Sequence, residues 1–193
     1  MARQRISLFA LLAFVGLTAA CEGPTTTATR SVLAPRASTS ASGGYMLFTS
    51  DAAGDQTKTA LIDEHGGSIR FQGSALIVPA GAVSAPTRFT FRLHTQPYMG
   101  ADLSAVDLNG EAVVTFPLPL TLTISYARAR TQIPDPSKIV MLWVENGVVL
   151  DQLPSTPDVQ GKKVTAQVTH FSDYTPGVPA DPDSPLQSGF QIW

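Results

Sequence analysis

The chain has 193 residues, which suits one domain with an ordinary core and is too short for two once the ends are discounted. Charged residues make up 15% and hydrophobic residues 44%, with 15 glycines and 15 prolines, a balance that favours short strands and many turns over long helices. The formal net charge of -2 excludes the basic field that a nucleic-acid partner requires.

Residues 1–20 are predicted to be a secretory signal peptide. Arg3 and Arg5 precede the apolar run Ile6–Leu17, and small residues follow it. This run is shorter than the roughly 20 residues that a membrane-spanning helix needs, so we interpret it as a cleaved signal.

Cys21 is the single cysteine of the chain and follows this signal directly. The segment Leu17-Thr18-Ala19-Ala20-Cys21 resembles the lipobox of bacterial lipoproteins, although Thr18 stands where that pattern usually has leucine. The resemblance implies that Cys21 is acylated and anchors an extracytoplasmic protein to a bacterial membrane, and Glu22 favours the outer membrane or cell surface. The alternative is ordinary cleavage before Cys21, which leaves a free thiol.

Residues 21–44 are predicted to be a lipid-anchored flexible linker, because they are rich in Thr, Ser, Ala and Pro and offer almost no large apolar side chain to bury. Residues 45–60 form a short apolar lead-in segment. Its first part, Tyr45–Ser50, is a first strand or a clip against the domain, and Asp51–Thr59 is polar.

The main domain is predicted over residues 61–175 and is organised around three strands. Ser68–Phe71 and Ala75–Val78 flank a break at Gln72-Gly73, and Thr87–Thr95 follows a turn at Pro79–Ala82. In the third strand apolar and polar residues alternate, which turns one set inward and the other outward. The inward set is Phe89, Phe91 and Leu93, and the outward set is Arg88, Thr90, Arg92 and His94.

The next segments are predicted from the same two features, which are the alternation of apolar and polar residues and the prolines and glycines that interrupt strands. Gln96–Gly110 is predicted to be a loop with a short helical turn around Leu103–Leu108. Pro117 and Pro119 indicate a bend or an edge position, and a half-buried strand runs from Leu120 to Tyr126.

The clearest hairpin joins Lys138–Glu145 to Val148–Leu153 through Asn146-Gly147, the preferred two-residue connection. Both faces of its first arm are apolar, so that strand is expected to be central in its sheet or covered on both sides. Lys162–His170 is the last predicted strand. The strand pattern predicts an all-β fold, an antiparallel two-sheet β-sandwich.

Residues 176–193 are predicted to be a proline-rich C-terminal tail. It ends with Phe190 and Trp193, which suit either a docking peptide or a segment that folds back over the sandwich.

The order of short motifs over residues 61–175 resembles that of the ZU5 domain. The motifs are Gly66-Gly67, Leu76–Ala82, Phe116-Pro117, Tyr126, the tryptophan-bearing hairpin and His170-Phe171-Ser172. The resemblance implies a β-sandwich interaction module, as in the similar domains of bacterial surface lipoproteins. Nothing in the chain resembles the ankyrin repeats or death domain of the animal versions, so their spectrin partner is not implied.

His170-Phe171-Ser172 is the sharpest chemical candidate. In death-domain relatives of the ZU5 family, a His-Phe-Ser sequence is cut by the chain itself, which implies Ser172 as nucleophile and His170 as general base for cleavage after Phe171. The alternative is structural: His170 is half-buried and bonded to a loop carbonyl, and Phe171 fills the core beyond a bulge.

Metal, cofactor and enzyme sites are not predicted. His65, His94 and His170 are widely spaced, and no nucleophile elbow, zinc-protease motif or phosphate-binding loop is present.

The predicted function is that of a non-enzymatic cell-envelope lipoprotein, held in the membrane through acylated Cys21, whose β-sandwich binds an envelope protein or polysaccharide. Two alternatives stay open. One is a self-processing domain cut between Phe171 and Ser172, and the other is a structural spacer without a specific ligand.

Overall fold

The computed structural model describes residues 41–42, 44–50 and 54–180, and these residues form an all-β fold. The predicted signal peptide and most of the predicted linker lie outside this part of the chain. One turn of 3-10 helix, η1 (Pro136–Lys138), interrupts the strands. Within the described ranges, no helix has the length and apolar character needed to cross a membrane.

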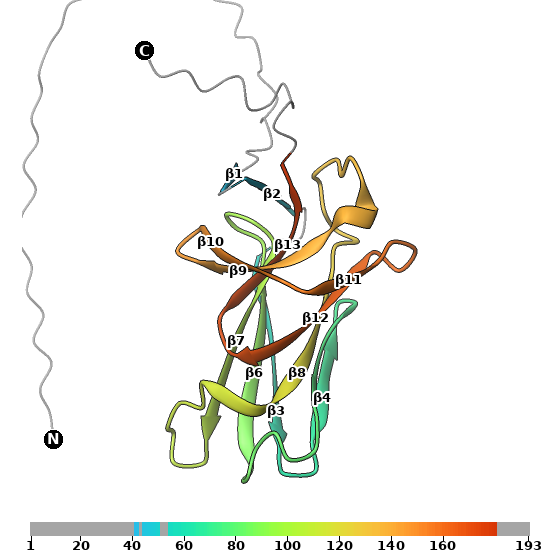
Figure 1. The fold of residues 1–193 in the computed structure, drawn as a ribbon. Helices are drawn as coiled ribbons and strands as arrows, with labels where there is room; N and C mark the ends of the chain where they lie inside the picture. Colours follow the sequence, from blue (N-terminus) through green and yellow to red (C-terminus); the bar gives the residue numbers. More distant parts are fainter. Residues whose placement is uncertain (1–40, 43, 51–53, 181–193) are drawn as a thin grey trace, which may run out of the picture. The chain divides into compact units, whose positions relative to one another are not determined.

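The strands pair into two antiparallel sheets that pack together as a β-sandwich (Figure 1). The first sheet runs in the order β1 (Ala41–Ser42), β2 (Tyr45–Leu47), β13 (Asp173–Pro179), β7 (Gly100–Asp107), β6 (Thr87–His94) and β3 (Gln56–Ile62), with β9 (Val140–Glu145) beside β13 and β10 (Val148–Leu153) beside β9. The second sheet runs in the order β11 (Ser155–Asp158), β12 (Lys163–His170), β8 (Thr115–Ser125), β5 (Ser74–Val78) and β4 (Gly67–Phe71).

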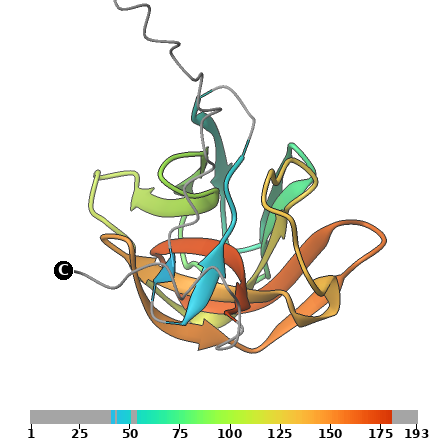
Figure 2. The ribbon, with the colours of Figure 1, turned by 90° about the horizontal axis from the view of Figure 1, so that it is seen from above.

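The core lies between the sheets and is supplied by alternate residues of the strands. Phe89 and Phe91 of β6 are fully buried, and so are the inward residues of β8, namely Leu120, Leu122 and Ile124. In the view of Figure 2, β7 and the β4–β5 hairpin lie on opposite sides of this core. Phe71 of β4 meets Phe91 edge to face across it, with ring centroids 5.2 Å apart. The predicted alternation is confirmed in β8 and over most of β6, and it fails at the end of β6, where His94 is buried.

The β9–β10 hairpin is also confirmed. Asn146 and Gly147 both have positive φ, 51° and 80°, as the two central positions of such a turn require. β9 lies between β10 and β13, and its side chains on both faces are covered, among them Met141, Leu142 and Val144.

Residues 96–110 were predicted to be a loop with a helical turn, but the structure has strand β7 within them. β7 pairs with β6 along its whole length, from Thr87↔Asp107 to His94↔Gly100. Its inward residues are Ala101, Leu103 and Ala105. Two of these three are alanines, which give a weak hydrophobic signal in the sequence although they lie on the core face.

Two further strands exceed the predicted limits. β3 begins at Gln56, inside the expected polar lead-in. Its sequence can be polar because it is an edge strand whose outer face is solvated. β13 extends to Pro179, so the boundary expected at residue 175 falls inside a strand, and Lys162–His170 is not the last one. Pro176 pairs with Met141 of β9 on one edge of β13, and on the other edge it lies between the residues that pair with β7 and those that pair with β2, where a missing N–H interrupts no pairing.

Pro117 and Pro119 occupy the unpaired part of β8. β5 pairs only with residues 121–123 of β8, and the register with β12 shifts between Val168 and His170. A missing N–H therefore interrupts no ladder at these positions, in agreement with the predicted bend or edge.

Candidate functional site

Two sets of predicted functional residues lie outside the described part of the chain. They are Cys21, the predicted site of lipidation, and the aromatic residues Phe190 and Trp193 of the tail. Acylation of Cys21 therefore stays a prediction.

His170 ends β12 and packs among aromatic residues. Its ring lies 4.6 Å from that of Trp143, and its Nδ1 is 3.3 Å from the hydroxyl oxygen of Tyr174. The same hydroxyl donates a hydrogen bond to the His170 carbonyl at 2.8 Å. Burial raises the pKa of Tyr174, so this hydroxyl stays protonated and able to donate.

Phe171 fills the core and Ser172 continues the backbone toward β13. The Phe171 ring lies 4.7 Å from Phe116 and 5.8 Å from Phe89. The Ser172 carbonyl accepts a hydrogen bond from Leu103 N at 3.3 Å. Among the described residues no hydrogen bond joins the Ser172 hydroxyl to His170, and self-cleavage between Phe171 and Ser172 stays a prediction.

Asp63, Glu64 and His65 bring one ligand atom each to within 4.8 Å of one another. They are consecutive residues of the β3–β4 connection, and the Asp63 carboxylate accepts from His65 N at 3.0 Å. This backbone hydrogen bond holds the pKa of Asp63 below its usual value. All these contacts are those of an Asx turn, in which a side chain caps the backbone two residues on.

The sequence reasoning missed a buried network around His94. The prediction placed His94 on the solvated face of its strand, but the side chain is only 8% exposed. The connection between β6 and β7 covers it, since Tyr98 is buried and its carbonyl lies 3.1 Å from His94 Nδ1. Asp173 at the start of β13 lies on the other side, with Oδ1 2.7 Å from Nε2.

The chemistry of the acceptors fixes the protons of this network. A carbonyl faces Nδ1 and a carboxylate faces Nε2, an arrangement that favours the imidazolium form, in which both ring nitrogens donate. Burial opposes the charge, but hydrogen bonding to Asp173, its negative charge and the Tyr98 carbonyl outweigh it and raise the pKa of His94. The Tyr98 hydroxyl donates to the second Asp173 oxygen at 2.7 Å.

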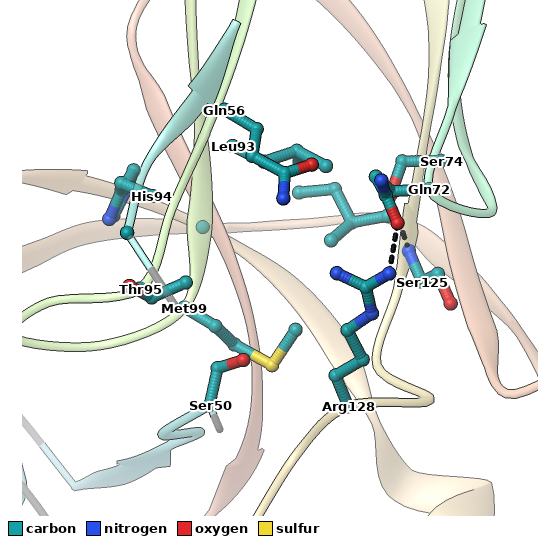
Figure 3. A pocket seen from close by; sticks show the side chains of 13 residues that line it. Ser50, Gln56, Gln72, Ser74, Leu93, His94, Thr95, Met99, Ser125 and Arg128 are labelled. Carbon is teal, nitrogen blue, oxygen red and sulfur yellow. Dashed lines mark hydrogen bonds between the residues drawn. The ribbon is translucent and has the colours of Figure 1, made fainter. Parts of the chain in front are cut away.

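A pocket of about 40 Å³ opens between the two sheets beside this network (Figure 3). Its apolar wall comes from both sheets, with Leu93, Met99 and Ile124, and its polar rim carries Gln56, Gln72 and Arg128. Both backbone polar groups of Met99 are hydrogen-bonded. Its N–H donates to the Phe48 carbonyl at 2.7 Å, and its carbonyl accepts from the Thr175 hydroxyl at 2.6 Å.

Arg128 gives the pocket its charge. The guanidinium points across the opening and donates to the Gln72 side-chain oxygen, as Figure 3 shows. Among the described residues, no carboxylate lies within ion-pair distance of it, and none of those that line the pocket is acidic. His94 also lines the pocket, but its charge is met by Asp173.

These residues could not be grouped from the sequence. His94 and Asp173 are 79 positions apart, and Arg128 and Gln72 are 56 apart. The sequence offers no local signal for the network, because His94 follows the alternation of β6 and only the structure shows that the β6–β7 connection covers it. Comparison with known proteins finds no family whose model matches the chain and no curated protein whose sequence matches it. The resemblance to the ZU5 domain therefore stays an expectation.

Proposed function

We propose that this chain is a non-enzymatic lipoprotein of the bacterial cell envelope whose β-sandwich works by binding an envelope protein or polysaccharide. The observation that supports a binding role is the pocket between the sheets. It combines an apolar wall with a few polar groups on its rim, as sites for small chemical groups commonly do. It also presents Arg128 without a carboxylate partner among the described residues.

A spacer without a ligand does not require such an arrangement. An exposed arginine held by a neutral glutamine has its positive charge left for an external group, because Gln72 accepts a hydrogen bond but brings no charge. The lipobox resemblance supports the location, since acylated Cys21 would keep the domain at the membrane surface.

The anchor is tested by fractionation of cells that produce either the natural chain or the Cys21→Ser variant. We expect the natural chain in the membrane fraction with acyl mass on Cys21, and the variant in the soluble extracytoplasmic fraction. An unacylated chain that is soluble in both cases would contradict the anchor.

Binding is tested with the mature Cys21→Ser chain and washed cell envelopes. We expect saturable retention that unlabelled protein competes away, weakened by Arg128→Ala and unchanged by Arg88→Ala. Arg88 is a matched control because it is an exposed arginine six residues before His94 on β6, about 20 Å away along the strand. Protease treatment or polysaccharide digestion of the envelopes then identifies the class of partner. Absence of saturable retention would favour the spacer.

A further inference from the structure

We propose that the pocket between the sheets receives the C-terminal residue of a peptide chain. In this arrangement the free carboxylate pairs with Arg128, and a small aliphatic side chain enters against Leu93, Met99 and Ile124. The inference rests on the proposed binding function and names the chemical group that the site takes.

Charge is the first argument. Two of the described residues that line the pocket are cationic, and one of them, His94, directs both ring nitrogens away to Tyr98 and Asp173. Arg128 is the other, and none of the described lining residues is acidic. A guanidinium carries five N–H donors in a planar fork that matches the two oxygens of a carboxylate.

The position of Arg128 is fixed by a tight turn. Its acceptor Gln72 belongs to the two-residue connection between β4 and β5, with φ of 53°, and Gly73 follows with φ of 80°. This connection is as short as a hairpin allows, so the acceptor is held on a rigid element. The hydrogen bond to Gln72 favours a position of Arg128 over the opening, which reduces the cost of ordering this side chain on binding.

The size and the polarity of the pocket favour a peptide terminus over a uronic acid as the source of the carboxylate. A cavity of about 40 Å³ suits a small aliphatic group better than a whole sugar ring. The wall is apolar, which favours a methyl or isopropyl group over the hydroxyls of a uronic acid. A peptide terminus with a residue such as alanine or valine meets both conditions, with its carboxylate at the rim and its side chain inside.

The rim offers groups for the rest of the terminal residue. Gln56 at the start of β3 points toward the same opening as Arg128 (Figure 3). Its side-chain amide can both donate to and accept from a peptide group. The site would therefore read one residue and its peptide bond, and the remaining ligand would lie outside the pocket.

The test is a titration of the mature Cys21→Ser chain with N-acetyl-L-alanine, followed by the NMR signals of the methyl groups of Leu93, Met99 and Ile124. We expect saturable shifts of these methyls. N-acetyl-L-alaninamide has a neutral amide in place of the carboxylate. It should bind about tenfold more weakly, because hydrogen bonds to charged groups contribute more than neutral ones. Arg128→Ala should weaken binding of the acid by a similar factor, and Arg88→Ala should leave it unchanged.

Three outcomes would overturn the proposal even if the probe binds. They are equal shifts with the acid and the amide, unchanged affinity in Arg128→Ala, and tighter binding of glucuronic acid than of N-acetyl-L-alanine. Urea unfolding of Arg128→Ala verifies that the variant is folded, which its exposed position predicts. If envelopes retain the protein but the probe does not bind, this inference alone fails. If neither binds, the proposed function fails as well.

Discussion

His94 meets a hydrogen-bond acceptor at each of its ring nitrogens, and this single residue connects three parts of the chain. It lies at the end of β6, contacts the connection that follows it through Tyr98, and reaches β13 through Asp173. Asp55, which pairs with Arg92 at 2.5 Å and accepts from Thr95 N at 3.3 Å, adds a second negative charge nearby. The network is balanced only while the imidazole carries its proton.

We therefore predict that stability falls as the solution becomes alkaline. The pKa of His94 is raised in the folded chain above the ordinary value of about 6.5, so the folded state holds a proton that the unfolded state releases. The stabilisation is fully present below about pH 6.5 and is lost as the pH rises through the higher folded pKa. Urea unfolding measured from pH 5.5 to pH 9 should show this decline.

The variant that tests the assignment is His94→Gln. An amide can replace one donor but not both, so we expect a loss of about 1–3 kcal/mol in the free energy of unfolding at pH 6. The decline between pH 6.5 and pH 9 should be much shallower in this variant. An equal decline in both proteins would assign the pH dependence to another group.

At the scale of elements, the β3–β4 connection depends on Gly66. Its φ is +80°, and a Cβ there would meet the backbone oxygen of Val78 at 2.6 Å and the nitrogen of Ala80 at 2.7 Å. Gly110 has the same kind of backbone, with φ of +84°, but nothing lies within 4 Å of its Cβ position. Substitution of Gly110 therefore measures the cost of the backbone conformation alone, and substitution of Gly66 measures that cost together with steric overlap.

We predict that Gly110→Ala lowers the free energy of unfolding by about 1–2 kcal/mol, the cost of the left-handed conformation. Gly66→Ala adds the displacement of a neighbouring turn, worth about 1–3 kcal/mol more. Denaturant unfolding of the two variants beside the natural chain measures the difference. Similar losses in both would mean that the Pro79–Ala82 turn moves away at little cost.

The elements that the sequence predicted correctly are those with a local signal. Strand β6 has strict alternation, and the β9–β10 hairpin has Asn146-Gly147 at its turn. β7 and β13 were missed because their signals depend on neighbours. Alanine contributes to a core only where the partner strand is close, and Pro176 is acceptable only because two different strands flank it. The site was missed for the same reason, since its contacts join residues far apart in the chain.

At the scale of the whole molecule, the core has to supply the stability. The chain has one cysteine, so no intrachain disulfide can contribute. The free energy of unfolding of such a domain is about 5–15 kcal/mol, which a few misplaced core residues can remove. The limits of the folded unit therefore matter as much as its composition.

The last strand sets one of these limits. We predict that a chain ending at Ala180 unfolds cooperatively and that one ending at Thr175 does not. The shorter chain loses Gly177, Val178 and Pro179, which pair with β2, and so leaves Leu47 without the strand that covers it.

Exposure of Leu47 together with removal of Val178 costs about 3–6 kcal/mol of apolar burial, a large part of the total stability. The chain ending at Ala180 keeps every pairing of β13 that the described residues make, including Ala180 N to Gly44 O at 2.7 Å. Circular dichroism during urea unfolding distinguishes the two chains. Cooperative unfolding of the shorter chain would contradict this prediction. It would place the end of the folded domain at residue 175 and show that the sheet is stable without residues 176–179.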